Sequence, residues 1–172
     1  YESNFSCWQS YKNIKNIKNL QNIKFYKVDI LNKKKLESIF KRNKIEIIIH
    51  LAALVKLEES ILDPKKYWRS NLIGTINILN CMTKYNINKI LYTSTAAVYK
   101  WSKKNLNEND NIKLSNPNAE TKFYSEQMIK IYSKLFKIKS IIFRFFNVSG
   151  ANYKFKIGER VKPPTHFITI LL

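Results

Sequence analysis

The feature that most constrains the fold of this chain is an alternation of short runs rich in Ile, Phe and Tyr with longer segments of helical spacing. The short runs have the length and β-branched content of strands: residues 23–30, 46–51, 89–94 and 140–145. The longer segments place apolar residues three and four apart, as helices do: residues 34–41, 63–84 and 117–136. Strands and helices that alternate with short links are typical of a parallel sheet, so we predict an α/β fold.

Two of these segments carry more detailed signals. The run Glu46-Ile-Ile-Ile-His-Leu51 is continuously apolar at its centre, which predicts a strand buried on both faces of the sheet. His50 lies near the end of this strand, where we expect it to pack and hydrogen-bond rather than to catalyse. Asp63 followed by Pro64 is the favoured order at a helix start, a cap and then a proline in the first turn.

Composition narrows the function classes. The 172 residues suffice for one domain with a substantial core, and no stretch of about 18 uncharged apolar residues exists, so no membrane helix is expected. Cys7 and Cys81 have no metal-ligand spacing, so we expect no metal site and two free thiols in a reducing, cytoplasmic compartment. The net charge of +19 could attract nucleic acid, but the lysines are scattered and no recognition motif accompanies them.

A series of short motifs follows the predicted strands and helices in order, and together they cover most of residues 23–172. They are Val28-Asp29-Ile30, His50-Leu51-Ala52-Ala53-Leu54, Glu59-Ser60 with Pro64, Asn71-Leu-Ile-Gly74-Thr75, Thr93-Ser-Thr-Ala-Ala-Val-Tyr99, Glu120-Thr-Lys122 with Glu126, Arg144-Phe-Phe-Asn147-Val-Ser-Gly-Ala151, Ile157-Gly-Glu159 and Pro164-Thr-His166. Each motif is weak by itself, but the ordered set resembles the UDP-glucose 4-epimerase family of extended short-chain dehydrogenases/reductases.

That resemblance implies a Rossmann-like, doubly wound parallel sheet and a reaction assisted by tightly bound NAD. In the family, NAD takes a hydride from C4 of a UDP-hexose while a tyrosine takes the O4 proton, and the hydride then returns to the other face. UDP-glucose and UDP-galactose are thereby interconverted. The resemblance assigns Thr95 to the hydroxyl that polarises O4, and Lys122 to the cation that lowers the pKa of the tyrosine and holds the nicotinamide ribose.

The position of the family tyrosine is occupied by Asn118 in this chain. The tyrosine and the lysine of the family lie one helical turn apart on one face, and counting back from Lys122 leads to Asn118. An amide has no acid/base equilibrium near neutral pH, so it cannot accept the O4 proton. The activity of this chain is therefore in question.

The resemblance also assigns the contacts with ligands and partners. The residues expected to contact the cofactor are Asp29, Ile30, Leu51, Ala52, Ala53, Asn71, Lys122 and Phe146. Those expected to contact the UDP-hexose are Thr95, Asn147, His166 and Phe167. Extended members usually form homodimers through the helices before and after the Thr95 strand, so we expect the full-length protein to be a homodimer, with no membrane or specific nucleic-acid partner.

The chain departs from the family pattern at its start. Its three glycines cannot build the glycine-rich turn that holds the cofactor pyrophosphate, and the chain begins at Tyr1, with methionine at Met82 and Met128 alone. We therefore expect an internal fragment of the family. Residues 1–160 would form a partial NAD-binding domain without its first strand, and residues 161–172 the start of the substrate-binding region.

Two other functions stay open. A related nucleotide-sugar dehydratase or reductase would share the fold, although a dehydratase would be expected to carry an acidic pair where this chain has Val98-Tyr99-Lys100. A non-catalytic basic protein that binds nucleic acid or acidic partners would account for the charge and for Asn118. Binding that depends steeply on salt, without an effect of NAD, would favour that function.

Overall fold

The structure is a computed structural model that describes residues 23–100, 105–154 and 156–158. The chain divides into two compact units, one formed by Val28–Phe146 and the other by Tyr1–Lys27 together with Asn147–Leu172. The boundary expected at residue 160 stays a prediction, because residues 159–172 lie outside the described part of the chain.

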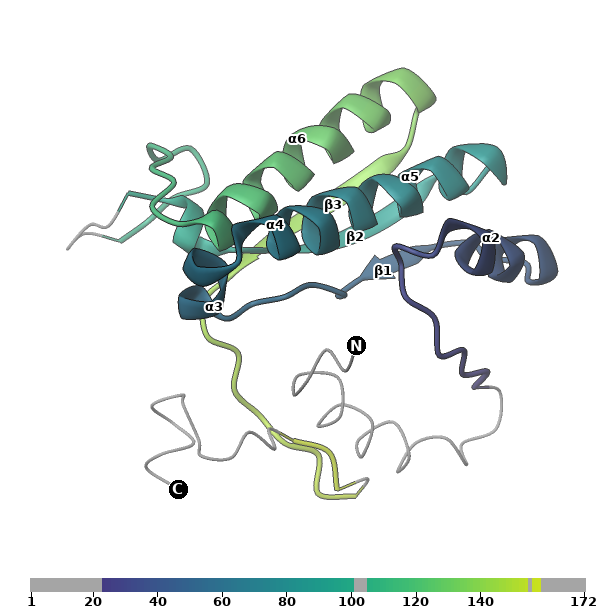
Figure 1. The fold of residues 1–172 in the computed structure, drawn as a ribbon, viewed down its shortest axis with the longest axis horizontal. Helices are drawn as coiled ribbons and strands as arrows, with labels where there is room; N and C mark the ends of the chain where they lie inside the picture. The colour runs from purple at the N-terminus through teal and green to yellow at the C-terminus, as the bar shows by residue number, and fades with distance from the viewer. Residues whose placement is uncertain (1–22, 101–104, 155, 159–172) are drawn as a thin grey trace. The chain divides into compact units, whose positions relative to one another are not determined.

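Val28–Phe146 contains a parallel sheet (Figure 1). Strands β1 (Ile48–His50), β2 (Lys89–Thr95) and β3 (Lys139–Phe145) lie in the order β1-β2-β3, and both pairings are parallel. Each strand is separated from the next by helices, which is the arrangement that the alternating sequence pattern predicts. The α/β prediction is confirmed.

Several helices of this unit begin or end where the sequence predicts, such as α5 at Lys84 and α6 at Pro117 and Phe136. They are α2 (Lys33–Arg42), α3 (Leu57–Leu62), α4 (Pro64–Tyr67), the π-helix η1 (Trp68–Ile73), α5 (Gly74–Lys84), the 3₁₀ turn η2 (Ala96–Val98) and α6 (Pro117–Phe136). The α3 helix was not predicted. The segment expected to be one helix over 63–84 is helical throughout from Pro64, but its middle six residues are wound as a π-helix.

Side-chain caps explain where two of these helices begin. The Asp63 carboxylate accepts a hydrogen bond from the Lys66 N–H at 3.1 Å, and Pro64 follows in the first turn of α4. The Asn116 side-chain oxygen accepts from the Ala119 N–H at 2.9 Å, and Pro117 opens α6 in the same way. The cap-then-proline signal therefore predicted the start at Asp63 correctly.

The strand predicted over residues 23–30 is wrong. Residues 23–29 have no regular secondary structure, and a turn follows at Ile30 and Leu31. A strand is stable only as a member of a hydrogen-bonded ladder. β1 pairs with β2 on one side, and among the described residues no strand pairs with its other side. The apolar pattern of 23–30 therefore has no ladder to join.

The expectation that the β1 segment is buried on both faces is also wrong. Helices α5 and α6 cover one face of the sheet (Figure 1), and His50 is buried on that face. On the opposite face, Ile49 is 59% exposed, and Ile141 and Phe143 of β3 are exposed as well. Within the unit Val28–Phe146 the sheet is therefore packed on one side only, although its sequence is apolar on both.

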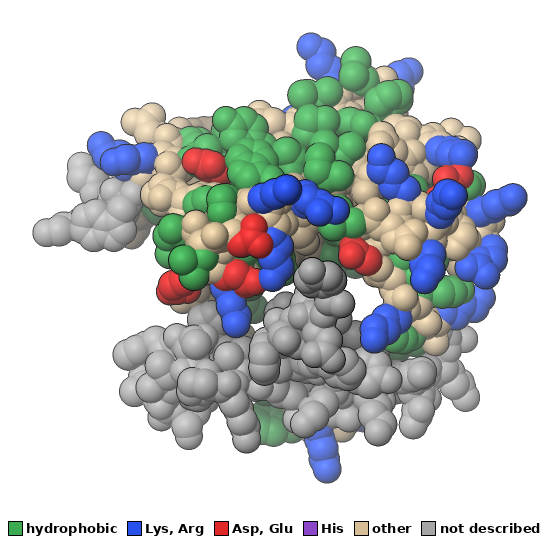
Figure 2. Space-filling model, in the orientation of Figure 1, with side chains coloured by type: hydrophobic (Ala, Val, Ile, Leu, Met, Phe, Trp, Pro, Cys, Tyr) green, Lys and Arg blue, Asp and Glu red, His purple; other side chains and the backbone are tan. Residues whose placement is uncertain are grey.

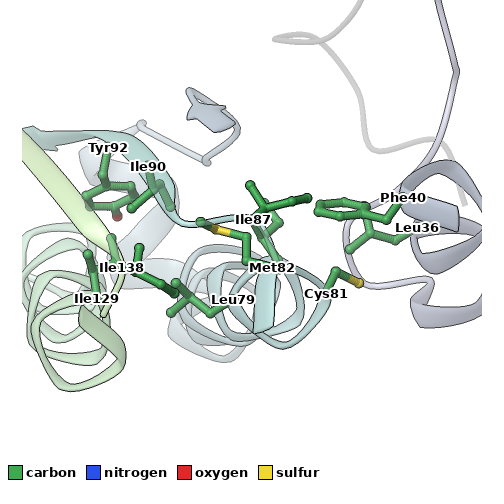
Figure 3. Packing of buried hydrophobic residues seen from close by; sticks show 11 residues of the cluster. Leu36, Phe40, Leu79, Cys81, Met82, Ile87, Ile90, Tyr92, Ile129 and Ile138 are labelled. Atoms are coloured by element: carbon green, nitrogen blue, oxygen red, sulfur yellow. The ribbon is translucent and has the colours of Figure 1, made fainter. Parts of the chain in front are cut away.

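The core of this unit fills the space between the sheet and helices α5 and α6 (Figure 3). Its central residues come from helices, strands and the links that precede the strands: Leu79, Met82, Ile87, Ile90, Tyr92, Ile129 and Ile138. On the α2 side, Leu36 and Phe40 extend the same cluster towards α5. Burial of each large apolar side chain stabilises the fold by roughly 1.5–3 kcal/mol.

The second unit contains one described turn. Asn152 and Ile157 form an antiparallel bridge, in which the N–H of each donates to the carbonyl of the other, at 2.8 and 3.0 Å. Gly150, just before it, has a φ of 146°, a conformation that side-chain-bearing residues rarely adopt.

On the face seen in Figure 2, Lys and Arg side chains lie around a hydrophobic area, many of them on the right-hand side and others at the top, centre and left. None of the helices that the structure describes combines the length and the apolar character needed to cross a membrane.

The packing of α5 leads to a matched prediction. Replacing the fully buried Leu79 by Ala should lower the free energy of unfolding by about 2–5 kcal/mol, because it leaves a cavity in the core. Leu135→Ala removes the same atoms from a helix position that is 67% exposed, and should change stability by less than about 0.5 kcal/mol. Urea unfolding of the two variants measures both values, and equal losses would contradict the packing described.

Candidate functional site

A buried lysine lies at the carboxyl end of β2. Lys122 of α6 is only 5% exposed, and its Nζ donates a hydrogen bond to the Thr93 carbonyl at 2.6 Å. The ammonium lies 5.0 Å from the centre of the Tyr92 ring. Burial lowers the pKa of Lys122 to about 8, and the charge of Glu126 opposes that shift. Of the other lysines on this helix, Lys130 and Lys134 are exposed.

Thr95, the second predicted catalytic residue, is the last residue of β2. Its Oγ1 accepts a hydrogen bond from the Ala97 N–H at 3.2 Å and so caps the η2 turn. Lys122 binds the carbonyl two residues earlier in the same strand. The structure thus brings both predicted side chains to the carboxyl end of β2, where α/β proteins bind ligands, and each is hydrogen-bonded to a different backbone group.

Asn118 lies one helical turn before Lys122, in the first turn of α6. Its Nδ2 donates to the Val55 carbonyl at 3.4 Å, a long hydrogen bond, while its Oδ1 is buried without a hydrogen-bond partner. A buried acceptor without a donor destabilises the fold by about 1–3 kcal/mol, unless a ligand supplies the donor. The position predicted to correspond to the family tyrosine therefore holds an amide oxygen that can accept a hydrogen bond but cannot take a proton.

Asn71 holds the loop that follows β1. It is buried in the π-helix η1, where its Oδ1 accepts from the Leu54 N–H at 2.8 Å and its Nδ2 donates to the Leu54 carbonyl at 3.0 Å. The same Nδ2 reaches the Thr121 hydroxyl of α6 at 3.1 Å. Its amide thus connects the loop, η1 and α6, and the π-helix is the element that presents it. Contact of Asn71 with a cofactor stays a prediction.

His50 packs beneath this site, as expected. Thr75 donates its hydroxyl hydrogen to the Asn71 carbonyl at 2.6 Å, so the Thr75 oxygen accepts from His50 Nε2–H at 2.9 Å. Desolvation lowers the pKa of His50 to about 4, and the charge of Lys122 acts in the same direction. The imidazole is therefore neutral at physiological pH and belongs to the buried support of the site.

The loop and the residues before α2 account for the other predicted cofactor contacts. Leu51 and Ala52 are exposed and Ala53 is half-buried, so their surfaces are available to a ligand. The Asp29 carboxylate accepts from the Leu31 N–H at 2.8 Å and shapes the turn before α2. Ile30 packs so closely on α5 that a Cβ added at Gly74 would lie 2.8 Å from the Ile30 Cγ1.

The remaining predicted residues lie at or beyond the end of this unit. Phe146, its last residue, is 70% exposed. Asn147 is exposed and belongs to the second unit. His166 and Phe167 lie outside the described residues. Their contacts with cofactor and substrate stay predictions.

An ion pair with a buried carboxylate lies beside the site, and the sequence analysis did not identify it. Arg144 of β3 binds Glu126 of α6 with Nη2–Oε2 and Nε–Oε1 distances of 2.7 and 3.0 Å, and the Ser94 hydroxyl donates to the same carboxylate. The hydrogen bonds to Glu126 raise the pKa of Arg144 further, so it is always charged. Both residues occur in motifs quoted above, but no sequence spacing indicates that residues 18 apart would meet.

Comparison with known proteins identifies the family of this chain. A model of the NAD dependent epimerase/dehydratase family matches residues 2–172. The UDP-glucose 4-epimerase of Lacticaseibacillus casei is 36% identical over 150 residues, which is 87% of this chain and 45% of that protein.

Two solved structures share the fold. The UDP-glucose 4-epimerase of Brucella ovis, in complex with NAD, has a TM-score of 0.78 at 30% identity and covers 84% of this chain and 45% of its own. The Bifidobacterium longum enzyme, in complex with NAD⁺ and UDP, has a TM-score of 0.78 at 28% identity and covers 86% and 45%. The chain spans about half the length of the relatives it matches. The match over nearly all of its residues nevertheless shows that the chain belongs to the NAD dependent epimerase/dehydratase family.

Proposed function

We propose that this chain is part of a nucleotide-sugar epimerase that interconverts UDP-glucose and UDP-galactose at C4 with the help of NAD. The observation that carries the proposal is Lys122, a buried lysine with a lowered pKa that binds the Thr93 carbonyl, two residues before Thr95 at the carboxyl end of β2. Burial of a lysine without a directly bonded carboxylate is unfavourable for folding, so it indicates a role in binding or chemistry.

NAD fits part of the site. When bound, it would supply the hydride acceptor and donor for C4. Lys122 would hold the nicotinamide ribose, and the exposed loop residues Leu51 and Ala52 would lie along the cofactor, held in place by Asn71. The three glycines of the chain do not build a pyrophosphate turn, so that contact would come from polypeptide outside these residues.

The substrate would meet Thr95 and Asn118 at this end of the sheet. The Thr95 hydroxyl would bind O4 of the hexose, and the free Asn118 Oδ1 would accept a hydrogen bond from a substrate hydroxyl. Asn147, His166 and Phe167 would contact the UDP moiety. Because no group at position 118 can take the O4 proton, we expect this site to bind better than it turns over.

A homodimer, in the cytoplasm, completes the proposal. Several apolar side chains of η1 and α6 are exposed: Ile73 of η1, and Tyr124, Ile131 and Leu135 of α6. A hydrophobic area is visible there in Figure 2. Such an area would be covered by a second copy of the protein.

Restoring the tyrosine tests the proposed chemistry. In the protein encoded by the complete reading frame, Asn118→Tyr should raise the conversion of UDP-galactose to UDP-glucose by about 10²-fold or more, because it supplies the proton acceptor. Asn118→Phe is the matched control, with the same ring and no hydroxyl, and should not raise it. If the Asn form already turns over as fast as the Tyr form, the proposed mechanism is wrong.

The buried state of Lys122 predicts a pH effect on stability. Between pH 8 and 10.5 the unfolded chain keeps the proton that the folded Lys122 has lost, so the free energy of unfolding should rise by about 2–3 kcal/mol over that window. Below pH 8 both states are protonated and the rise is absent. Lys122→Met should remove this rise, whereas Lys134→Met, at an exposed position of the same helix, should keep it. Denaturant unfolding as a function of pH measures the difference between the two variants.

A further inference from the structure

The ion pair between Glu126 and Arg144 is not used by the proposed chemistry, although its two members come from two different motifs. We propose that Glu126 and Arg144 are positioning residues, which hold the turn after β2 and the loop that follows it in the geometry that presents the Thr95 hydroxyl. The inference deepens the proposed function and rests on it for the role of Thr95.

Glu126 connects α6 to the residue immediately before Thr95. It is 1% exposed, and its Oε1 accepts a hydrogen bond from the Ser94 hydroxyl, which is also buried. Lys122 lies one turn earlier on the same helix and binds the carbonyl of Thr93. Two consecutive turns of α6 are thereby attached to two consecutive residues of β2, so the end of the strand cannot shift relative to the helix without breaking both contacts.

Arg144 extends the same contact to the loop. Its guanidinium lies 4.8 Å from the centre of the Tyr99 ring, and its Nη1 donates to the Glu108 carbonyl at 3.3 Å. Tyr99 lies on the outgoing arm of the loop and Glu108 lies before its return. One guanidinium therefore contacts Glu126, Tyr99 on the outgoing arm and Glu108 before the return at once, which the planar fork of arginine permits and lysine does not.

The two arms of the loop are paired beside Arg144. Tyr99 and Ile112 form an antiparallel bridge, the Lys100 N–H donates to the Asn111 carbonyl at 3.0 Å, and the Lys113 N–H donates to the Val98 carbonyl at 3.0 Å. This pairing is short and isolated, so it needs support from outside the loop to persist. Arg144 supplies that support from β3.

Electrostatics favours a positioning role over a purely stabilising one. An ion pair with a fully buried carboxylate gains little stability over apolar side chains of similar volume, because the charge of Glu126 loses its hydration. The pair instead fixes the positions of Ser94 and of the loop, through the hydrogen bond of Glu126 to Ser94 and the contacts of Arg144 with Tyr99 and Glu108. It also binds the Glu126 carboxylate to Arg144, so that Lys122 donates to the Thr93 carbonyl rather than to an acid.

Amide hydrogen exchange of the complete chain tests this inference without NAD or a UDP-sugar. Three amides report on the site: Ala97, which binds the Thr95 hydroxyl, and Lys100 and Lys113, which pair the loop arms. The Ile129 amide, in the interior of α6, reports on global stability. In Arg144→Met we expect the three reporter amides to exchange at least tenfold faster relative to Ile129 than in the unchanged protein.

A double variant removes the risk that the single change simply unfolds the protein. Glu126→Leu with Arg144→Leu leaves neither member of the pair as an unpaired charge, so Ile129 should keep its protection while the three reporter amides still lose theirs. Glu37→Gln breaks the exposed pair of Lys84 and Glu37 and should leave all four amides unchanged.

Two results of the hydrogen-exchange experiment would contradict the positioning role. Equal acceleration of all four amides, or no change at the three reporters in the double variant, would overturn the positioning role. Neither result depends on turnover, so the inference can fail while Asn118→Tyr still restores activity. Conversely, the positioning of Thr95 can be confirmed even if the complete protein proves to have no epimerase activity.

Discussion

The packing of α6 against the end of β2 is the contact on which the rest of this structure depends. The helix places three polar positions, Asn118, Lys122 and Glu126, at one-turn intervals along one face. Lys122 and Glu126 bind Thr93 and Ser94 directly, and Asn118 reaches the loop after β1. Hydrogen bonds to buried groups are directional, so this one face sets the register of helix, strand and loop together.

The buried polar groups around this face form a continuous network rather than isolated pairs. Asn71 joins the loop after β1 to α6, and Thr75 links that asparagine to His50 beneath the site. Most members are satisfied within the chain, and the exception is the Asn118 Oδ1. An unpaired acceptor at the edge of an otherwise complete network is where a ligand hydroxyl gains most, because the ligand removes an existing penalty.

Membership of the family is clear, whereas the residues of this site raise the separate question of whether the chain is active by itself. The parallel sheet and the match over residues 2–172 agree with a family that uses NAD. Two features argue against full activity of the chain by itself. Asn118 cannot take a proton, and three glycines do not build a turn for the cofactor pyrophosphate. One face of the sheet in the unit Val28–Phe146 is also left open, with Ile49 and Ile141 exposed, although apolar strands of a parallel sheet normally pack on both faces.

The sequence alone determined the α/β class, most strand and helix positions and the position of Lys122, because these follow from local periodicity, from caps such as Asp63 with Pro64, and from motif order. It did not reveal that residues 23–30 lack a strand, because a strand depends on a neighbour that local pattern cannot supply. Only the tertiary structure decided that Lys122 binds the Thr93 carbonyl and that Glu126 meets Arg144. Such contacts join residues from different elements, and long-range packing, which no short window of sequence contains, brings them together.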